Sequence, residues 1–591
     1  MDKYDFYTGN SFDAYEFMGA HIVNGGVMFR TYAPGAAGVS LIGEFGDWEE
    51  MPMERVDNFH ELFVSGAKEG MMYKYRIYER GGRVIDHCDP YGFGMELRPN
   101  NASVIRDLSA YKFTDSRWMR QRSDMKDEPL NIYELHLGSW RRDSEGGFLS
   151  YTEIGKELIP YLKENGYNYI EVLPLAEHPA DESWGYQVTG FFSPTSRYGT
   201  ASELMELVDM LHNSGIGIIM DYVPVHFAVD DYALAYYDGT ALYEYPSTDV
   251  GCSEWGSHNF MHSRGEVRSF LKSAANYWLR EYHFDGLRMD AIRNLIYWNG
   301  DEARGVNGGG VQFLQTLNDG LRSRHRGIML IAEDSTSYSG VTRPSSEGGL
   351  GFDYKWDMGF MHDTLSHFQS DAEERAACYN RLTFSMMYFY NERYLLPFSH
   401  DEVVHGKATI VQKMNGDYEK KFPQARALYM YMYAHPGKKL NFMGSEFGQL
   451  REWDELREQD WELLRYPIHS GFARYMRDLC LVYENHPALY ADDYSPDGFK
   501  WLICEDDGSC VYAFERTGEG ERIITVLNLS DEPRKVRIET GAQKLIQLLS
   551  TDNVIYGGNK EYPQETVTEA KDGVLTLDTA PQSGTMLLAA E

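Results

Sequence analysis

The feature that most constrains the fold is a series of eight short apolar runs in the middle of the chain, each followed by a polar segment. Amphipathic stretches such as SELMELVDMLHNS (202–214) and EVRSFLKSAANYWLREY (266–282) lie between the runs. Strands that alternate with helices favour a parallel sheet, and eight such units favour a closed (β/α)8 barrel. Residues 227–265 lack the pattern and are interpreted as a long insertion after the third strand. The predicted strands lie within residues 131–140, 167–175, 215–226, 284–291, 327–334, 354–360, 394–402 and 438–448.

The two ends of the chain have a different, all-β pattern. Near the N-terminus, VMFRTYAPGAAGVSLIGEF (27–45) alternates β-forming residues around a Pro-Gly turn, and MMYKYRIYERGGRVI (71–85) is typical of a hairpin. The pattern returns in CVYAFER (510–516), RIITVLNLS (522–530) and GTMLLAA (584–590). A chain of 591 residues is too long for one core. We predict a multidomain α/β protein with an N-terminal β-sandwich (1–110), a central TIM barrel (111–488) and a C-terminal β-sandwich (489–591).

Charge and cysteine content narrow the possible partners and the compartment. The formal net charge of −34 argues against a nucleic-acid partner, because phosphates would be repelled, and it suits a neutral substrate. The six cysteines have no metal-ligand spacing and are too sparse for a disulfide scaffold, which favours a reducing compartment. We find no signal-peptide pattern at the N-terminus and no run near the ~20 apolar residues of a membrane span. We therefore expect a cytoplasmic protein with no membrane partner, and the sequence leaves its oligomeric state open.

Acidic side chains gather where four of the predicted strands end. In barrels of this kind, the chemistry takes place at the carboxyl ends of the strands. Residues two apart on a strand point the same way, so the guanidinium of Arg288 should favour the ionised form of Asp290. Each cluster alone also fits a buried ion pair, a helix cap or a turn, but four at successive strand ends favour an active site. The clusters are Asp221 with His226, Arg288 with Asp290, Glu333 with Asp334, and His400 with Asp401.

Two carboxyl groups of opposite protonation predict retaining glycoside hydrolysis or transfer. An ionised and oriented Asp290 would attack the anomeric carbon. Glu333 follows the apolar run GIMLIA, whose surroundings favour a protonated acid. It would protonate the departing oxygen and then deprotonate the incoming hydroxyl. Asp401 would stabilise the oxocarbenium-like transition state, while His226 and His400 would donate hydrogen bonds to the same sugar ring.

These stretches resemble known signature motifs. DYVPVH (221–226), GLRMDAIR (286–293), AEDST (332–336) and FSHDE (398–402) resemble, in order, the four signature regions of the α-amylase family of glycoside hydrolases. Three further stretches are similar to one subgroup, the 1,4-α-glucan branching enzymes of glycogen synthesis: LPLAEHPADESWGYQVTGFFSPTSRYGT (173–200), SHDEVVHGK (399–407) and AHPGKKLNFMGSEFGQLREW (434–453). TYAPGAAGVSLIGEFGDW (31–48) resembles the N-terminal glycogen-binding-type module of such proteins, and RPNNASVI (98–105) resembles their junction.

The resemblance implies a reaction and a role for particular residues. The reaction is that of a glycosyltransferase (hexosyltransferase), which cleaves an α-1,4 glucan by retaining double displacement. It then transfers the chain to a 6-hydroxyl and so forms the α-1,6 branches of glycogen. Asp290 matches the nucleophile, Glu333 the acid/base and Asp401 the transition-state stabiliser. The positions that match sugar-binding residues are Tyr186, as a stacking aromatic, and Asp221, His226, Arg288 and His400.

Three positions depart from the family pattern. Val225 stands where many amylases have an Asn that binds a structural calcium, and since valine has no ligand atom we predict no metal there and no cofactor. Asp334 stands where branching enzymes usually have Glu, which keeps the charge but shortens the side chain by one methylene. The segment YWNGDEARGVNGGGVQF (297–313) is shorter than the usual loop after strand four, so the preferred chain length stays open.

Several alternatives stay open at this point. The carboxylates alone do not distinguish transfer from hydrolysis, because transfer requires a bound acceptor that competes with water. The alternatives are an α-glucan hydrolase, a 4-α-glucanotransferase of the same family, and a non-catalytic glucan-binding protein, although the intact acidic residues argue against the last. Trp184 is either a sugar platform or a packing residue of a surface loop. Trp48 and Tyr73 are either glucan platforms or core residues of the N-terminal sandwich.

Overall fold

The computed structural model describes residues 1–505, 508–563 and 566–590, and these divide into two compact units. Unit 1 contains Met1–Ser123, His136–Glu157 and Glu171–Asp353, and unit 2 contains the rest. The eight strands predicted for the barrel are all confirmed, and they form a closed barrel in chain order. They are β10 (Asn131–Leu135), β11 (Tyr169–Val172), β14 (Gly217–Tyr222), β17 (Gly286–Met289), β18 (Met329–Ala332), β19 (Tyr354–Trp356), β20 (Tyr394–Phe398) and β21 (Lys438–Phe442).

The barrel strands are parallel and short, and nearly all of their residues are buried. In unit 1, β14 pairs with β17 and β17 with β18. In unit 2, β10 pairs with β21, which also pairs with β20. Strands that are covered on both faces read as continuous apolar runs, which is the pattern that predicted them. The longer helices are α4 (Tyr151–Asn165), α5 (Ala201–Asn213), α7 (Gly265–Glu281), α9 (Gly308–Arg324), α10 (Met358–Gln369), α14 (Tyr418–Ala434) and α15 (Pro467–Asn485).

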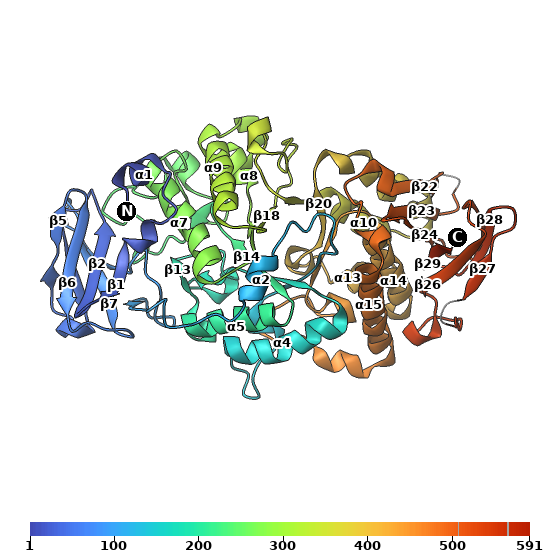
Figure 1. The fold of residues 1–591 in the computed structure, drawn as a ribbon, viewed down its shortest axis with the longest axis horizontal. Coiled ribbons are helices and arrows are strands. Elements are labelled where there is room, and N and C mark those ends of the chain that lie inside the picture. The colour runs from blue at the N-terminus through green and yellow to red at the C-terminus, as the bar shows by residue number, and fades with distance from the viewer. Residues whose placement is uncertain (506–507, 564–565, 591) are drawn as a thin grey trace. The chain divides into compact units, whose positions relative to one another are not determined.

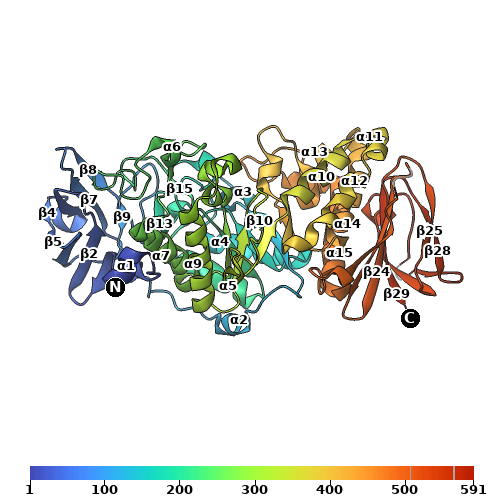
Figure 2. The same cartoon turned by 90° about the horizontal axis from the view of Figure 1, so that it is seen from above.

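Two of these helices show how local sequence sets helix starts. The hydroxyl of Thr200 accepts the amide of Glu203, whose carboxylate accepts the amide of Thr200, so a capping box begins α5. At the start of α7, Gly265 allows close contact with α1 (Lys3–Thr8), because a Cβ there would lie 1.9 Å from the carbonyl oxygen of Tyr7. Figure 1 and Figure 2 both show α1 beside α7. The hydroxyl of Ser269 donates to the carbonyl of Phe6 at 2.9 Å, which ties the N-terminal segment to the helix.

Residues 227–265 contribute no strand to the barrel. They contain α6 (Thr248–Gly251) and β16 (His258–Asn259), which pairs with β15 (His226–Phe227) in an antiparallel ribbon. This ribbon anchors the segment at His226, four residues after β14 ends. The segment is therefore held next to a strand end that carries predicted site residues.

The N-terminal strands form two sheets, as predicted for a sandwich. The hairpin predicted over 71–85 is confirmed, with Gly82 in the left-handed region at a φ of 88°. Tyr73 is fully buried and its hydroxyl donates to Asp89 at 2.7 Å, so it is a core residue and not a sugar platform. Trp48 remains 40% exposed. The sheets consist of β1 (Gly19–Val23), β2 (Gly26–Tyr32), β6 (Phe59–Ser65) and β5 (Glu54–Val56), and of β4 (Met51–Pro52), β3 (Gly38–Gly43), β7 (Met72–Tyr78) and β8 (Val84–His87), with β9 (Ser103–Val104) beside β7.

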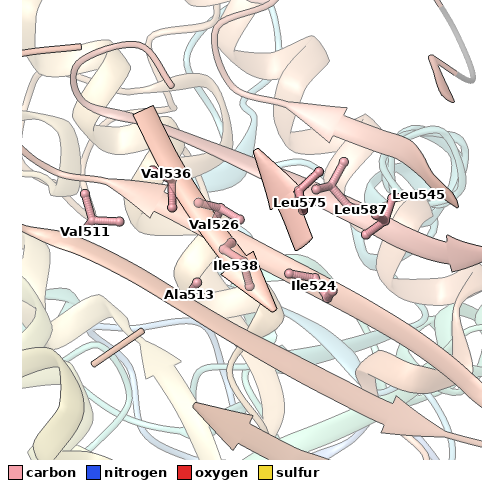
Figure 3. Close-up of a cluster of buried hydrophobic side chains, with 9 residues drawn as sticks. All are labelled: Val511, Ala513, Ile524, Val526, Val536, Ile538, Leu545, Leu575 and Leu587. Carbon is pink, nitrogen blue, oxygen red and sulfur yellow. The ribbon is translucent and has the colours of Figure 1, made fainter. Parts of the chain in front are cut away.

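The C-terminal strands also form two sheets, which enclose an apolar core of Val, Ile, Leu and Ala side chains (Figure 3). Val526 and Ile524 from one sheet and Val536 and Ile538 from the other contribute to it. Each fully buried Val or Ile side chain stabilises the fold by about 1.5–3 kcal/mol. The six-stranded sheet consists of β22 (Phe499–Ile503), β23 (Val511–Gly518), β24 (Glu521–Asn528), β29 (Ser583–Ala590), β26 (Lys544–Ser550) and β27 (Val567–Glu569), and the other sheet of β25 (Arg534–Glu539) and β28 (Val574–Thr579). Over the described residues, no helix has the length and apolar character that a membrane span requires.

Candidate active site

A buried guanidinium is the centre of the site in unit 1. Arg288 lies on β17, is 1% exposed and stands opposite Asp221 of β14 in the sheet register. Its Nη1 lies 2.6 Å from Oδ2 of Asp221 and 2.9 Å from Oδ1 of Asp290, and its Nη2 lies 3.7 Å from Oε2 of Glu333. Burial alone would lower the pKa of Arg288, but the surrounding carboxylates raise it well above its ordinary value. The prediction that Arg288 and Asp290 point the same way is confirmed, and the cation is shared by carboxylates from three strand ends.

Backbone hydrogen bonds hold Asp290 and Glu333 next to each other. The amide of Asp290 donates to the carbonyl of Tyr222 at 3.0 Å, and the amide of Glu333 donates to that of Met289 at 3.1 Å. The amide of Ala291 donates to Oε2 of Glu333 at 2.7 Å, and Ala291 has a φ of 46°, which is an unfavourable conformation for a residue with a Cβ. Such backbone strain is retained where a turn has to aim a side chain. Both carboxylates are partly open, with side-chain exposures of 15% for Asp290 and 17% for Glu333.

The surroundings of Glu333 differ from the apolar ones expected from the run GIMLIA. Its carboxylate contacts the guanidinium of Arg288 and the amide of Ala291, both of which are polar. The run itself forms the buried strand β18, but it ends one residue before Glu333. The apolar character therefore belongs to the strand, while the side chain beyond its end meets charge and backbone N–H groups.

Two further predicted sugar ligands lie in the same unit. The hydroxyl of Tyr186 donates to Asp221 Oδ2, the oxygen that Arg288 also contacts. His226 is 2% exposed, and burial lowers its pKa to about 4, so its imidazole is neutral at pH 7. Within the described residues, Nδ1 of His226 has no hydrogen-bond partner. A neutral imidazole with an open ring nitrogen can still bond to a sugar hydroxyl.

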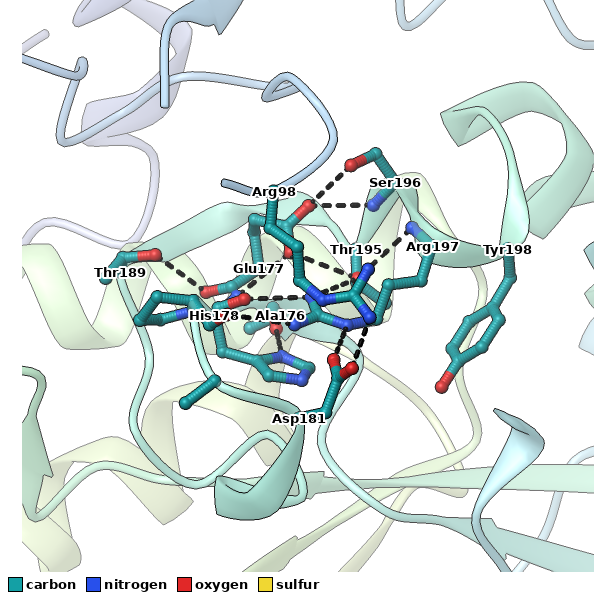
Figure 4. Close-up of polar contacts among 12 residues, drawn as sticks. Arg98, Ala176, Glu177, His178, Asp181, Thr189, Thr195, Ser196, Arg197 and Tyr198 are labelled. Atoms are coloured by element: carbon teal, nitrogen blue, oxygen red, sulfur yellow. Dashed lines mark hydrogen bonds and ion pairs between the residues drawn. The ribbon is translucent and has the colours of Figure 1, made fainter. Parts of the chain in front are cut away.

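A network of buried charges supports the loop that carries Tyr186 and Trp184. Arg197 donates from Nη1 to Glu177 and from Nε to Asp181, both at 2.7 Å, and Arg98 also bonds to Asp181 (Figure 4). The second carboxylate oxygen of Glu177 accepts the amide and the hydroxyl of Ser196. These bonds join both ends of the stretch 173–200, one of the motifs that indicated the branching-enzyme subgroup. The motif therefore has a structural basis, because it braces a strand-end loop.

The site residues of unit 2 rest on a second buried carboxylate. Glu134 lies on β10 and is 1% exposed; it accepts the backbone amide of His400 at 2.9 Å and its Nδ1 at 2.5 Å. Because a carboxylate only accepts hydrogen bonds, Nδ1 carries a proton. The other ring nitrogen, Nε2, lies 3.6 Å from Oδ1 of Asp401, whose side chain is 49% exposed. Sequence reasoning missed Glu134, although a charged residue inside the apolar strand NIYEL was a usable signal.

The loop after Asp401 is fixed by a third subgroup motif. The carboxylate of Glu452 accepts the amides of Gly406 at 3.0 Å and of Ala408 at 2.7 Å. The amide of Trp453 donates to the carbonyl of Val403 at 3.0 Å. The stretches 399–407 and 434–453, which were separate resemblances in the sequence, are therefore parts of one substructure within unit 2.

Trp255 is an aromatic residue that sequence reasoning also missed. It is 43% exposed, and its ring lies 5.1 Å from that of His226. The carbonyl of Trp255 accepts from the side chain of Gln187, the neighbour of Tyr186. Glu254, which precedes Trp255 in the chain, pairs with Arg293 at 2.6 Å. Arg293 is three residues after Asp290, the predicted nucleophile. Contacts with three site-bearing segments hold this exposed ring at the rim.

The remaining predicted residues have mixed surroundings. Trp184 is partly buried and has a φ of 56° at the end of a short 3-10 helix. Asp334 is buried and accepts the amide and the hydroxyl of Thr336, so the shorter side chain closes its own turn. The loop 297–313 is tied down by Glu302, which accepts the amide and the hydroxyl of Ser337. Among the described residues, no group of three or more His, Cys, Asp or Glu side chains is arranged to hold a metal ion.

Comparison with known proteins gives the family. Models of carbohydrate-binding module 48 (isoamylase N-terminal domain), of the alpha amylase catalytic domain and of the alpha amylase C-terminal all-beta domain match residues 17–92, 154–241 and 501–590. A 1,4-alpha-glucan branching enzyme GlgB of Geobacillus stearothermophilus is 43% identical over 545 residues, covering 90% of this chain and 85% of that protein. The GlgB of Marinobacter nauticus is 42% identical over 586 residues, covering 95% and 93%. This chain belongs to the family of 1,4-alpha-glucan branching enzymes.

The branching-enzyme family and the fold predicted from the sequence motifs are thus both confirmed. The fold is shared more widely. A pullulanase from Anoxybacillus sp. LM18-11, solved with maltotetraose, superposes with a TM-score of 0.77 at 17% identity, covering 100% of this chain and 89% of that chain. A putative alpha amylase from Salmonella typhimurium gives a TM-score of 0.72 at 19% identity, covering 97% and 99%. At this identity, the likeness concerns the architecture alone.

Proposed function

We propose that this branching enzyme cleaves an α-1,4 glucan and re-forms the bond to a 6-hydroxyl by retaining double displacement. Asp290 attacks the anomeric carbon and forms the glycosyl-enzyme, while Glu333 gives a proton to the departing 4-oxygen. Glu333 then takes the proton of the incoming 6-hydroxyl, and the sugar is released from Asp290. Asp401 stabilises the positive charge that develops on the ring in both steps. The substrate is an α-1,4 glucan chain, and the product is a branched glucan such as glycogen.

The observation that supports this proposal best is the position of Arg288. The guanidinium contacts Asp290 at 2.9 Å and Asp221 at 2.6 Å, and a neighbouring cation favours the ionised form that a nucleophile needs. The same guanidinium lies 3.7 Å from Glu333, so one side chain contacts both the proposed nucleophile and the proposed acid/base. Asp221, with Tyr186 bonded to it, and His226 are the proposed ligands of the cleaved-side sugar, together with His400 and Trp184.

The test uses wild-type protein, Asp290→Asn and a matched Asp301→Asn control. Asp301 is exposed and caps a short helix in the rim loop, so its variant should keep full activity. Each protein is incubated with linear amylose, and proton NMR records new α-1,6 anomeric signals while reducing ends are counted. We expect branching by wild type and control, and none by the folded Asp290→Asn variant. Undiminished branching by Asp290→Asn would contradict the role of Asp290. A rise in reducing ends without α-1,6 signals would indicate a hydrolase.

We further propose that Trp255 is a stacking platform for a glucose unit next to the cleaved bond. An exposed ring held by its neighbours can receive the apolar face of a sugar without ordering cost. A sugar that covers about 50 Å² of the ring would gain ~1 kcal/mol, or about fivefold in KM. We expect Trp255→Ala to raise KM for amylose about fivefold with little change in kcat, and Trp255→Phe to restore most of the loss. An unchanged KM in Trp255→Ala would exclude this role.

We also propose domain boundaries near residues 110 and 488, and a cytoplasmic location without a nucleic-acid or membrane partner. The matched ranges 17–92 and 501–590 fall inside the proposed outer domains. Within the described residues, Cys88, Cys252, Cys378, Cys480 and Cys504 form no disulfide, which fits a reducing compartment. Limited proteolysis with mass spectrometry of the fragments tests the boundaries, and cell fractionation tests the location.

A further inference from the structure

A cleft lies in unit 1, with a volume of about 550 Å³. Arg122 marks its position, because Nη1 donates to the carbonyl of Phe284 at 3.1 Å, just before β17 begins. The chain at Arg122 also passes within 2.5 Å of where a Cβ of Gly327 would lie, just before β18. The cleft is therefore at the amino ends of the strands whose carboxyl ends carry Asp290 and Glu333. It is not part of the catalytic site.

The lining of this cleft has the opposite charge to the chain as a whole. Four arginines and two histidines line it, against one carboxylate, that of Asp13. The whole chain has 56 Lys and Arg residues against 90 Asp and Glu residues, so a cleft of average composition would be acidic. The arginines are Arg122, Arg280, Arg324 and Arg326, and the histidines are His325 and His283, which contacts Asp115 at 2.8 Å. The cleft is a local cationic site on an acidic protein.

Several of these cations are not neutralised by the protein. Arg280 pairs with Glu16 at 2.5 Å and with Asp13 at 3.4 Å, but in the described residues neither Arg324 nor Arg326 has an ion-pair partner. The guanidinium of Arg324 is fixed 4.1 Å above the ring of Phe12.

Arg122 is also incompletely satisfied. Its side chain is 5% exposed, and among the residues that the structure describes it makes one ion pair, a 3.6 Å contact with Asp285. In the part of the chain that the structure describes, its buried Nε has no hydrogen-bond partner. An unsatisfied buried donor of this kind costs about 1–3 kcal/mol, a cost that a bound acceptor would remove.

The arginines converge on one imidazole. The pKa of His325 is lowered to about 4, first by burial and then by the positive charges of Arg122, Arg324 and Arg280. Nε2 of His325 bonds to Asn276 Oδ1 at 2.7 Å, so the ring is held in place. These three arginines come from three chain segments and line the same cleft as His325. An anion placed among them would offset their mutual repulsion.

Helix ends explain only part of this cluster. The helices α7 and α9 end at the cleft, and basic residues in a last turn interact favourably with the helix dipole. Arg280 and Arg324 occupy such positions. Arg122 and Arg326 lie outside the two helices, so the dipoles do not account for them.

We propose that this cleft binds a small phosphorylated compound, with its phosphate group among Arg122, Arg324 and Arg326. Guanidinium groups bind phosphate oxygens through paired, charge-assisted hydrogen bonds, which is why arginine recurs in phosphate sites. Met119 and Leu279 supply an apolar wall for the rest of the ligand. The volume lies within the ~300–1,000 Å³ range of small-molecule sites. The compound is not a substrate of the branching reaction, and the inference does not depend on the proposed catalytic roles.

The test measures binding of inorganic phosphate and of pyrophosphate by isothermal titration calorimetry at constant ionic strength. The variants are Arg324→Gln/Arg326→Gln, whose side chains are exposed, and Arg465→Gln as an exposed control in unit 2; circular dichroism checks that each is folded. We expect saturable binding by wild type and control, and binding about tenfold weaker in the double variant. NMR of histidine-labelled protein should show the pKa of His325 rising when phosphate is added.

Two results would overturn the proposal. One is equal binding of both anions by wild type and the double variant, which would assign the binding to another place. The other is the absence of saturable binding to wild type, with the His325 resonance unchanged. Branching activity on amylose should be retained in the double variant without added anion, which separates this test from that of Asp290.

Discussion

Replacement of Glu134 by glutamine tests whether a buried carboxylate holds His400 in position. The two oxygens of Glu134 accept the backbone amide and Nδ1 of His400, at 2.9 and 2.5 Å. A glutamine has the same shape but only one acceptor oxygen, so one of these two buried donors loses its partner and meets an NH2 group instead. Leaving a buried donor unsatisfied costs about 1–3 kcal/mol.

The middle of this range, about 2 kcal/mol, corresponds to roughly 30-fold in a rate constant. The loss should appear in catalysis, because Nε2 on the other side of the ring is the nitrogen that faces Asp401. We expect kcat/KM of Glu134→Gln on amylose to fall about 30-fold. Iodine staining of the amylose measures the rate, and thermal melting shows whether the variant is folded.

A double-mutant cycle with His400→Gln isolates the mechanism. If Glu134 acts through the imidazole of His400, the double variant should be no less active than His400→Gln alone, because the side-chain bond has already been removed and the glutamine oxygen at position 134 can still accept the backbone amide. Independent, multiplicative losses would refute this reasoning. Glu446→Gln is the matched control: both tyrosine hydroxyls that contact this buried side chain bond to Oε1, an acceptor that a glutamine keeps, so the variant should stay folded and show no coupling to His400.

Three further outcomes follow from the contacts. Arg288→Lys replaces a fork that reaches several carboxylates by a single ammonium, and we expect kcat/KM to fall about 100-fold, from ~3 kcal/mol, while circular dichroism stays native. Burial alone would lower the pKa of His212, but two buried aspartates raise it to about 9. Because this pKa is higher in the folded than in the unfolded chain, the contribution of His212 to the free energy of unfolding is complete below pH about 6.5. About 3 kcal/mol of it is lost as the pH rises through about 9. The melting temperature of wild type should therefore fall over that range and that of His212→Asn should not; parallel curves would contradict the assignment. Glu452→Gln removes one of the two acceptors that hold the loop after Asp401, so we expect KM to rise a few-fold and kcat to fall by less. An unchanged KM would show that the loop does not need this support.

The barrel could be predicted because its signal is local and repeated. Buried strands read as apolar runs, and amphipathic helices read as a 3.6-residue period. Even the strand in 354–360, which is only three residues long, lies where the alternation requires it. The pairing of Arg288 with Asp290 was also predictable, because both lie at one strand end, two residues apart.

The surroundings of Glu333 show where an apolar run stops being informative. The hydrophobic run preceding it describes the buried strand β18, whereas the side chain beyond the strand meets groups from the neighbouring strand end. The sequence also does not show which aromatic residues are exposed. Trp255 and Tyr73 are both aromatic residues in loop-rich or β-rich sequence, yet one is at the rim and the other is fully buried.

The sequence by itself determined the order of the elements, the family, and which strand ends carry carboxylates, since all three depend on residue types at short, regular spacings. Only the tertiary structure decided which groups meet. Glu134 and His400 are 266 residues apart, and their contact depends on the register between β10 and its neighbours in the barrel. The cationic cleft likewise joins the segments around Arg122, Arg280 and Arg326. Contacts of this kind arise from how strands and helices pack, and no pattern within one segment encodes the position of another.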